Sequence, residues 1–382
     1  MSELDLALFG ALPSFAEPVL LGQRYFPSWE RYRQAFQDIF DRQYYTEYGP
    51  LNQQLEQNLQ RFLGVRHAIC VTNETVGLMM AADAIGLSGS VIVPRPALAS
   101  SVQSLQWAGL EPLYCDMDSG TCQIRIEQVE SMINENVSAI MGVHLWGGSC
   151  DPERLAHIAA ARGIQLYFDA AHAFGCEVDG TRIGGFGRCE VFSFHQANIL
   201  NATEGGCVCT NDDELAARLR TMRSSSGAGV TVSVTRTVNG RMSEAQAAIA
   251  LMSLADFPVN RQINENLHCR YDIGLEPIPG LELSKPTGVS LSNFQCALCR
   301  VDELKYGLSA KALAALLNAE NVCAEAEAPY SQQSSDADAP GVSIIQLPIG
   351  AGMTIQLVDD ICAILAKAHR AAPAIRARPA AS

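Results

Sequence analysis

Residues 165–175, QLYFDAAHAFG, are the most informative segment of the chain for its fold. The apolar run Leu166–Phe168 predicts a short buried strand, because it follows a helical segment that Gly163 terminates. Asp169 ends this strand, and His172 lies about one helical turn further on. Ligands of open α/β sheets bind at the carboxyl ends of the strands, so this segment puts an acid and an imidazole where a site is expected.

The same alternation of strand and helix extends along the chain on both sides of this segment. Such alternation implies βαβ units, and therefore an α/β fold with a mainly parallel sheet and helices on both of its faces. The expected strands are residues 67–71, 91–94, 111–115, 139–144, 165–169, 191–194 and 206–210, and the expected helices are 51–63, 73–85, 126–133, 152–162, 212–224 and 243–256.

Chain length and Pro258 predict two domains. A single core rarely grows beyond about 250–300 residues, and Pro258 interrupts the last of these helical patterns. We therefore expect a large domain with an irregular N-terminal arm over residues 1–257 and a small C-terminal α/β domain over residues 258–382. The tail, residues 371–382, is rich in alanine, proline and arginine and is expected to fray. The small domain is expected to hold strands 296–301 and 342–347 and helices 310–319 and 357–368.

Charge and composition exclude several classes of partner. The net charge is −14 and no basic run is present, whereas nucleic acids and anionic membranes attract clustered lysine and arginine. No apolar stretch reaches the ~18–20 residues that span a bilayer, and no leader is recognisable, so we expect a cytoplasmic protein with a small-molecule substrate.

The 13 cysteines are dispersed, many of them in apolar segments, which indicates buried thiols rather than disulfides. Cys296 and Cys299 have the spacing of a metal knuckle. Without a second pair, a buried strand or turn is the favoured interpretation, and no metal is expected.

Polar residues collect where the expected strands meet the helices that follow. Each has an ordinary structural alternative: Asn73 is also a good N-cap, and a lone histidine is more often a satisfied core residue than a catalytic one. A helix start nevertheless offers free backbone N–H groups to an anion. The candidate site residues at these junctions are Asn73, Glu74, Thr75, Asp169, His172, Ser193, His195, Asn198 and Asn239.

Taken in order, these motifs resemble those of the DegT/StrS family of pyridoxal-phosphate (PLP) sugar aminotransferases, which have the aspartate aminotransferase fold. No single motif is decisive, but their order and spacing are, and the likeness covers most of the chain. The resemblance implies a PLP-transferase fold of type I and a nucleotide-linked keto sugar as substrate. The matching motifs are Tyr48-Gly-Pro-Leu51, Leu63-Gly-Val-Arg-His-Ala68, Asn73-Glu-Thr75, His144-Leu-Trp-Gly147, Phe168-Asp-Ala-Ala-His-Ala-Phe-Gly175, Ser193-Phe-His195, Glu204-Gly-Gly206, Asn239-Gly-Arg-Met242 and Leu347-Pro348.

Two residues match positions at the cofactor ring. Asp169 matches the carboxylate that pairs with the pyridine nitrogen and keeps it protonated, so that the ring can accept electrons. His172 takes the position, often glutamine, near the phenolic oxygen of the cofactor. The resemblance therefore implies that both side chains bind PLP or pyridoxamine phosphate (PMP).

Other residues match positions at the cofactor phosphate. Thr75, with the adjoining backbone of Asn73 and Glu74, and Ser193 match the phosphate-binding cup. Asn239 matches a residue that reaches the phosphate in the neighbouring subunit. The resemblance thus implies a homodimer with shared sites.

The sequence departs from the family at the residue that holds the cofactor covalently. Aligned on Ser193 and on the Glu204-Gly-Gly206 motif, the Schiff-base lysine falls on Asn198, whose amide is not nucleophilic. The chain has four lysines, and the first is Lys285, so no lysine of the expected large domain can replace it. Ordinary lysine-anchored transamination is therefore not expected.

Two further departures concern the same cofactor. Leu98 stands where the family usually has an aromatic residue stacked on the pyridine ring. Glu74 lies in the phosphate cup, where small residues are common, and a carboxylate there would repel a phosphate dianion unless it is turned away.

Three hypotheses remain open. In the first, the chain is an enzyme that holds PMP or PLP without a covalent bond, as in the family's sugar 3-dehydratases, with His195 transferring a proton and Asn198 orienting the substrate imine. In the second, it has discarded the cofactor and uses Asp169, His172 and His195 for another reaction in the same cleft. In the third, it is a non-catalytic homologue that forms a heterodimer with an active one and donates Asn239 across the interface.

Overall fold

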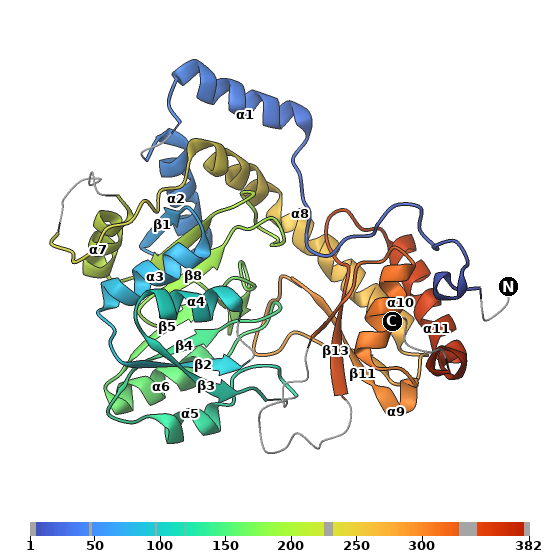
Figure 1. Cartoon of the computed structure of the whole chain (residues 1–382). Helices are drawn as coiled ribbons and strands as arrows, with labels where there is room; N and C mark the ends of the chain where they lie inside the picture. Colours follow the sequence, from blue (N-terminus) through green and yellow to red (C-terminus); the bar gives the residue numbers. More distant parts are fainter. Residues whose placement is uncertain are drawn as a thin grey trace. The chain divides into compact units, whose positions relative to one another are not determined.

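The computed structural model describes residues 5–45, 48–95, 98–118, 120–224, 232–327 and 342–377. The chain forms two compact units, coloured along the sequence in Figure 1. The sequence predicted a single boundary at residue 258, and the structure divides the chain differently. The first 24 residues belong to the smaller unit, and residues 286–293 belong to the larger one. The larger unit comprises Tyr25–Pro258 and Pro286–Asn293, and the smaller comprises Met1–Arg24, Val259–Lys285 and Phe294–Ser382.

Strands and helices alternate through most of the larger unit, as the sequence predicts. They are α1 (Trp29–Arg42), α2 (Pro50–Leu63), β1 (His67–Val71), α3 (Glu74–Ile85), β2 (Ser90–Arg95), α4 (Ala99–Trp107), β3 (Glu111–Asp116), α5 (Ile126–Met132), β4 (Val137–Val143), α6 (Pro152–Arg162), β5 (Gln165–Asp169), the hairpin β6 (Glu177–Val178) and β7 (Thr181–Arg182), β8 (Glu190–Ser193), β9 (Gly206–Thr210), α7 (Asp213–Arg223) and the first part of α8 (Glu244–Leu275).

Seven strands form one mixed sheet in the order β1-β9-β8-β5-β4-β2-β3. The strands from β8 to β3 in this order run parallel, whereas β9 is antiparallel to both of its neighbours. β1 therefore runs in the same direction as the parallel strands. This confirms the predicted α/β class with a mainly parallel sheet, and it brings the carboxyl ends of β1, β8 and β5 to one edge.

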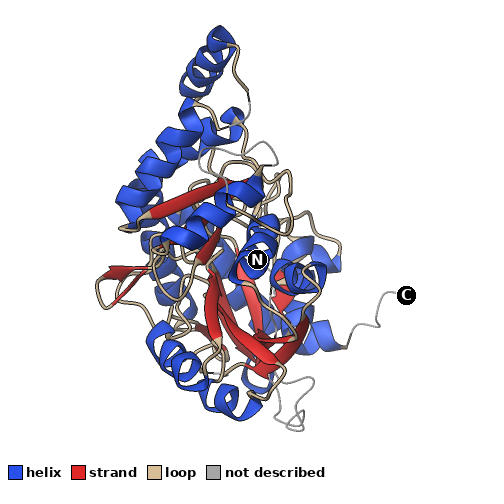
Figure 2. Cartoon of the chain, turned by 90° about the vertical axis from the view of Figure 1, so that its left-hand side faces the viewer, coloured by secondary structure: helices blue, strands red, loops and turns tan. Residues whose placement is uncertain are grey.

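Helices cover both faces of this sheet, because alternate strand residues point to opposite sides. Val191 faces α3, where Gly77 lies against it. Its neighbour Phe192 packs in a buried cluster with Leu55 of α2 and Ala247 of α8. Figure 2 shows helices, in blue, on both sides of the strands, in red. The predicted layering is therefore confirmed.

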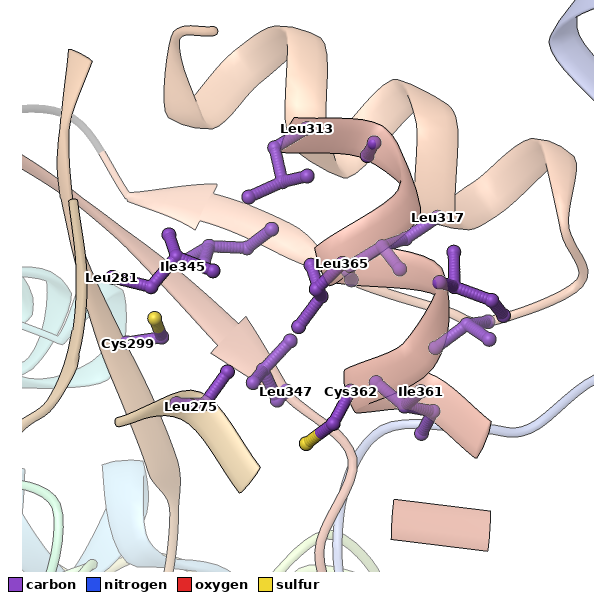
Figure 3. Close-up of a cluster of buried hydrophobic side chains, with 14 of the residues drawn as sticks. Leu275, Leu281, Cys299, Leu313, Leu317, Ile345, Leu347, Ile361, Cys362 and Leu365 are labelled. Carbon is purple, nitrogen blue, oxygen red and sulfur yellow. The ribbon is translucent and has the colours of Figure 1, made fainter. Parts of the chain in front are cut away.

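The smaller unit contains a four-stranded antiparallel sheet in the order β10-β11-β13-β12. Figure 3 shows its core, in which Leu313 and Leu365 of two helices lie near Ile345 and Leu347 of the sheet. The elements are the 3₁₀ helix η1 (Ala7–Phe9), the end of α8, β10 (Leu281–Leu283), β11 (Ala297–Asp302), α9 (Glu303–Tyr306), α10 (Ala310–Ala319), β12 (Glu325–Glu327), β13 (Val342–Leu347) and α11 (Ile355–Arg376).

The cysteines behave as buried thiols. All 13 are free, and all but two of them are buried. Cys299 lies in β11 and Cys296 just before it, which confirms the buried-strand interpretation of this pair. Among the residues that the structure describes, no group of three His, Cys, Asp or Glu side chains could hold a metal ion. Within the same residues, no helix has the length and apolar character that crossing a membrane requires.

The prediction that Pro258 ends a helix was wrong. α8 continues through Pro258 to Leu275 and passes from the larger unit into the smaller. A proline inside a helix costs about 3 kcal/mol, chiefly through one lost hydrogen bond. Here the helix has buried residues on both sides of the proline, Phe257 and Asn260, and packing outweighs that cost.

The ends of the chain are also more helical than predicted. The N-terminal arm contains α1, which Ser28 caps by accepting a hydrogen bond from the backbone N–H of Arg31. The expected frayed tail begins as helix, since α11 reaches Arg376 and buries Ala372 and Ile375. Residues 378–382 lie outside the described residues.

Candidate active site

The carboxyl ends of β1 and β8 meet the start of α3 at one edge of the sheet. Val71 pairs with Gly206, and Gly206 pairs in turn with Ser193. Glycine is required at this position, because a Cβ atom on Gly206 would lie 2.8 Å from the carbonyl oxygen of Phe192 and 2.9 Å from the backbone nitrogen of Glu74. This close approach fixes the first residue of α3 beside the end of β8.

The first turn of α3 confirms the N-cap interpretation of Asn73. Its side-chain oxygen accepts a hydrogen bond from the backbone N–H of Val76 at 2.9 Å. The cap uses one of the orphan N–H groups of this helix start. Thr75 is half-buried in the same turn, where the resemblance places the phosphate cup.

Asp169 is fully buried at the end of β5. One carboxylate oxygen, Oδ1, accepts a hydrogen bond from the backbone N–H of Ala171 at 3.0 Å, and the other, Oδ2, accepts one from the hydroxyl of Ser101. Its backbone oxygen accepts a hydrogen bond from the N–H of His144 at 2.9 Å. Asp169 is therefore held rigidly, with both side-chain oxygens engaged.

The side chain of Glu74 turns inward to Asp169. Although Glu74 begins a helix, it is only 8% exposed. Its Oε1 accepts a hydrogen bond from the hydroxyl of Ser100 at 3.0 Å, and Asp169 and Ser193 lie near enough to its carboxyl to shift its pKa. We call Glu74 and Asp169 the carboxyl pair.

Burial and proximity favour one protonated carboxyl in the carboxyl pair. Burial, and then the negative charge of Asp169, raise the pKa of Glu74 well above its ordinary value. Burial also raises the pKa of Asp169, while the bonds from Ser101 and Ala171 lower it. The two directions favour Glu74 as the protonated member of the pair, the one that can donate to Asp169, as two adjacent buried carboxyls require.

His172 follows Asp169 by three residues and carries a neutral imidazole. Burial lowers its pKa to about 4. Its Nδ1 accepts a hydrogen bond from the backbone N–H of Trp146 at 3.4 Å, so the ring proton resides on Nε2. The backbone oxygen of His172 accepts a hydrogen bond from the amide of Asn293 at 3.1 Å. The arrangement suits a hydrogen-bond donor rather than a base.

His195 faces the surface. Its Nδ1 accepts a hydrogen bond from the N–H of Ala197 at 3.3 Å, and its Nε2 lies 3.8 Å from Oε1 of Glu204. The side chains of His195 and Glu204 are 45% and 61% exposed. The structure therefore does not join His195 to the carboxyl pair by a hydrogen bond that it describes.

Asn198 belongs to the buried part of the site. It is 6% exposed, and its Nδ2 donates to the carbonyl oxygen of Ser193 at 3.0 Å. Leu98 lies at the N-cap of α4 and is half-buried. Asn239 is exposed, and its Oδ1 accepts a hydrogen bond from Nε of Arg241 at 3.1 Å.

Glu74, Asp169, Ser193 and Asn198 thus form one buried polar cluster, whereas Asn239 lies on the surface. Two side chains that bind the carboxyl pair did not follow from the sequence, the serines of α4. The signal for them is slight: two adjacent serines, Ser100 and Ser101, at the start of a helix that follows a strand end.

The cluster does not fit PLP in the manner that the resemblance implies. A pyridine nitrogen needs an acceptor position on Asp169, but an N–H, a hydroxyl and the carboxyl of Glu74 already surround that carboxylate. The side chain of Glu74 lies among Asp169, Ser100 and Ser193, between the expected phosphate cup and the expected ring position.

Comparisons with known proteins agree with the architecture. A model of the DegT/DnrJ/EryC1/StrS aminotransferase family matches residues 29–366. The dTDP-4-amino-4,6-dideoxy-D-glucose transaminase of Shigella dysenteriae is 30% identical over 278 residues, which span 73% of this chain and 76% of that protein.

Solved structures agree as well. The crystal structure of DesI in the presence of its TDP-sugar product matches with a TM-score of 0.89 at 32% identity and covers 99% of each chain, which confirms the predicted fold. A putative sugar aminotransferase from Streptococcus pneumoniae, solved in PMP and PLP forms, matches with TM-scores of 0.80 and 0.79 at 19% identity. It covers 94% and 93% of this chain and 100% and 99% of its own length, and at that identity it shows the fold alone.

Proposed function

Because the chain belongs to the DegT/DnrJ/EryC1/StrS aminotransferase family, whose members use PLP or PMP, we propose that it is a biosynthetic enzyme for a nucleotide-linked keto sugar or a related keto or amino substrate. Two relatives support this substrate class: the Shigella dysenteriae protein is a dTDP-sugar transaminase, and DesI has a TDP-sugar product. The proposed reaction is not lysine-anchored transamination.

The observation that carries this proposal is the side chain of Asn198. The motif resemblance places it at the family's lysine position, and the side chain is buried and binds the carbonyl oxygen of Ser193 at 3.0 Å. An amide nitrogen forms no Schiff base. PMP or PLP held without a covalent bond would still need Asp169, whose oxygens are engaged by Ser101, Ala171 and Glu74, so the reaction that we propose uses neither.

The reaction class that these side chains favour is proton transfer beside a carbonyl group. The raised pKa of Glu74 favours its protonated form, and when its O–H turns from Asp169 to a bound keto sugar it can give the proton to the carbonyl oxygen. The neutral ring of His172 can donate a second hydrogen bond through Nε2–H. The hydrogen on the neighbouring carbon then becomes acidic, and His195 is the candidate base that removes it. Return of the two protons gives an isomer of the substrate, and Asp169, buried behind Glu74, acts as a positioning residue.

Hydrogen exchange tests this reaction. The wild-type protein would be incubated in D₂O with a dTDP-linked 4-keto-6-deoxy sugar, and deuterium in the sugar would be followed by NMR and mass spectrometry. We expect incorporation beside the carbonyl, and Glu74→Gln should slow it by about 10²–10⁴-fold, the usual contribution of a general acid. Glu153→Gln, at an exposed position, is the matched control and should not slow it.

A non-catalytic partner of an active homologue is the second candidate, because the carboxyl pair is almost closed to solvent. Thermal shift separates the two candidates. Stabilisation by the dTDP-sugar together with exchange supports the enzyme, since a ligand that binds the folded state raises its melting temperature. A folded protein that shows neither effect contradicts the enzyme and favours the partner.

We further propose that the protein is a homodimer, with exposed aromatic residues in and beside α1 at the interface. Trp29, Phe40 and Tyr45 are 68%, 62% and 55% exposed, an unusual concentration for a monomer surface. Sedimentation velocity should give a dimer for the wild-type protein and a monomer for Trp29→Ser/Phe40→Ser. Leu304→Ser, at a residue that is 82% exposed in the smaller unit, should stay dimeric.

A further inference from the structure

We propose that the side chain of Glu74 fills the cofactor cradle, by which we mean the space between Asp169, Ser100 and Ser193. Its carboxyl donates to Asp169 in place of a pyridine nitrogen. The site therefore excludes PLP even when a lysine is supplied at position 198. The proposal rests on family membership and holds whichever substrate the enzyme uses. Under this proposal, Glu74 prevents PLP-dependent chemistry together with the absence of a lysine at position 198.

The backbone of Glu74 cannot move away from the cradle. Asn73 caps the helix through Val76 at 2.9 Å, and the absence of a side chain on Gly206 lets β9 approach the start of α3. A Cβ atom on Gly206 would lie only 2.9 Å from the nitrogen of Glu74. The side chain therefore starts at a fixed point next to the end of β8.

The carboxyl of Glu74 is held from three sides. The hydroxyl of Ser100 donates to Oε1 at 3.0 Å, and the carboxyl also lies close to Ser193 at the end of β8 and Asp169 at the end of β5, both of which affect its pKa. Side chains from α4, β8 and β5 thus converge on one carboxyl. Such convergence of polar groups is typical of a ligand-binding site, and here the group that they surround is a side chain of the same protein.

The chemistry of the two occupants is alike. A protonated pyridine nitrogen is an N–H donor to the family's aspartate, and the protonated Glu74 is an O–H donor to the same acceptor, Asp169. Either donor compensates the cost of burying the Asp169 carboxylate. The two donors compete for this carboxylate, whose oxygens Ser101 and the backbone of Ala171 already bind.

Restoring the lysine with and without Glu74 tests the proposal. Asn198→Lys should remain colourless with PLP. Asn198→Lys/Glu74→Gly should form a covalent adduct, in which the lysine amine condenses with the PLP aldehyde and releases water. The adduct is read as a visible absorption band and, after borohydride reduction, as a mass increase. Glu74→Ala in the same background repeats the test if the glycine variant does not fold.

Two matched controls separate occupancy from charge. Asn198→Lys/Glu74→Gln keeps the volume of the side chain and an N–H donor to Asp169, so it should stay colourless. Asn198→Lys/Glu153→Gln removes one carboxylate from an exposed position and should also stay colourless. A yellow glutamine variant would overturn the proposal, because occupancy would then not be what excludes the cofactor.

Equilibrium dialysis of the wild-type protein gives an independent reading. We expect no saturable binding of PMP or PLP. Saturable binding that Asp169→Asn abolishes would overturn the proposal, as would a visible band in Asn198→Lys alone. None of these measurements involves a nucleotide sugar, so the proposed reaction and the proposed occupancy can fail separately.

Discussion

Two buried glutamates beside the same sheet have opposite surroundings. Glu190, at the start of β8, is 0% exposed, and Glu74, at the start of α3, is 8% exposed. Glu190 accepts hydrogen bonds from Nε2 of His144 at 3.1 Å and from the backbone N–H groups of Gly184 and Phe186, the latter at 2.9 Å. The partners of Glu74 are hydroxyl groups and another carboxyl.

The difference separates a structural acid from a reactive one. When N–H donors surround a buried carboxyl, their hydrogen bonds offset its desolvation cost, and the carboxyl fixes the local structure. A buried carboxyl next to a second acid keeps a proton, which can move to a ligand. Burial alone does not distinguish the two groups, whereas their partners do.

The largest expected effect is on stability at Glu190. Glu190→Ala leaves the Nε2–H group of His144 and the N–H groups of Gly184 and Phe186 buried without their acceptor. We expect a loss of about 3–5 kcal/mol in the free energy of unfolding, measured with urea. Glu74→Gln, compared with the wild type at pH 4, where the unfolded chain is also largely protonated at this position, replaces a neutral donor by another and should change it by less than about 1 kcal/mol. Equal losses at the two positions would remove the distinction.

The second effect is a pH dependence of stability that Glu74 contributes. Its pKa is raised in the folded state, so the folded protein binds more protons than the unfolded chain above the ordinary value of 4.5, and stability falls as pH rises. Relative to Glu74→Gln, the wild-type protein should lose up to about 1.4 kcal/mol per pH unit from that point. Urea titrations at several pH values measure this slope. If the free energy of unfolding depended on pH in the same way in both proteins, the raised pKa of Glu74 would be contradicted.

A third effect, of opposite sign, is expected at His172. Its pKa is lowered to about 4, so between pH 6.5 and 4 the unfolded chain binds the extra proton and stability falls as pH falls. His172→Gln should reduce this acid sensitivity, as measured by melting temperature against pH. If the melting temperature of His172→Gln fell with pH as steeply as that of the wild type, another group would be the cause of the acid sensitivity.

The sequence predicted the larger unit well, because its signals are local. Strands 67–71, 165–169 and 206–210 coincide with β1, β5 and β9, and helix 152–162 coincides with α6. Each is a short apolar run or a helical pattern, and α6 is bounded by the turn-forming Gly163. α8 did not follow from the sequence, since Pro258 is tolerated only through packing with residues distant along the chain.

The site was predictable in its members but not in its contacts. Asp169, Ser193 and Glu74 follow from motifs at strand ends, whereas the inward turn of Glu74 depends on Ser100 and Asp169, which lie far from it along the chain. A motif assigns residues to a region, and the register of the sheet decides which of them touch. Asn239 shows the limit, because a partner subunit would complete its predicted role.

The protonation of Glu74 at neutral pH is the most direct measurement of this comparison. Protein labelled with ¹³C at the glutamate carboxyl carbons would be examined by NMR from pH 4 to pH 9, with the Glu74 signal assigned by its loss in Glu74→Gln. We predict that this signal keeps the shift of a protonated carboxyl through pH 7. A Glu74 signal that titrates completely near the ordinary glutamate value of 4.5 would contradict the account.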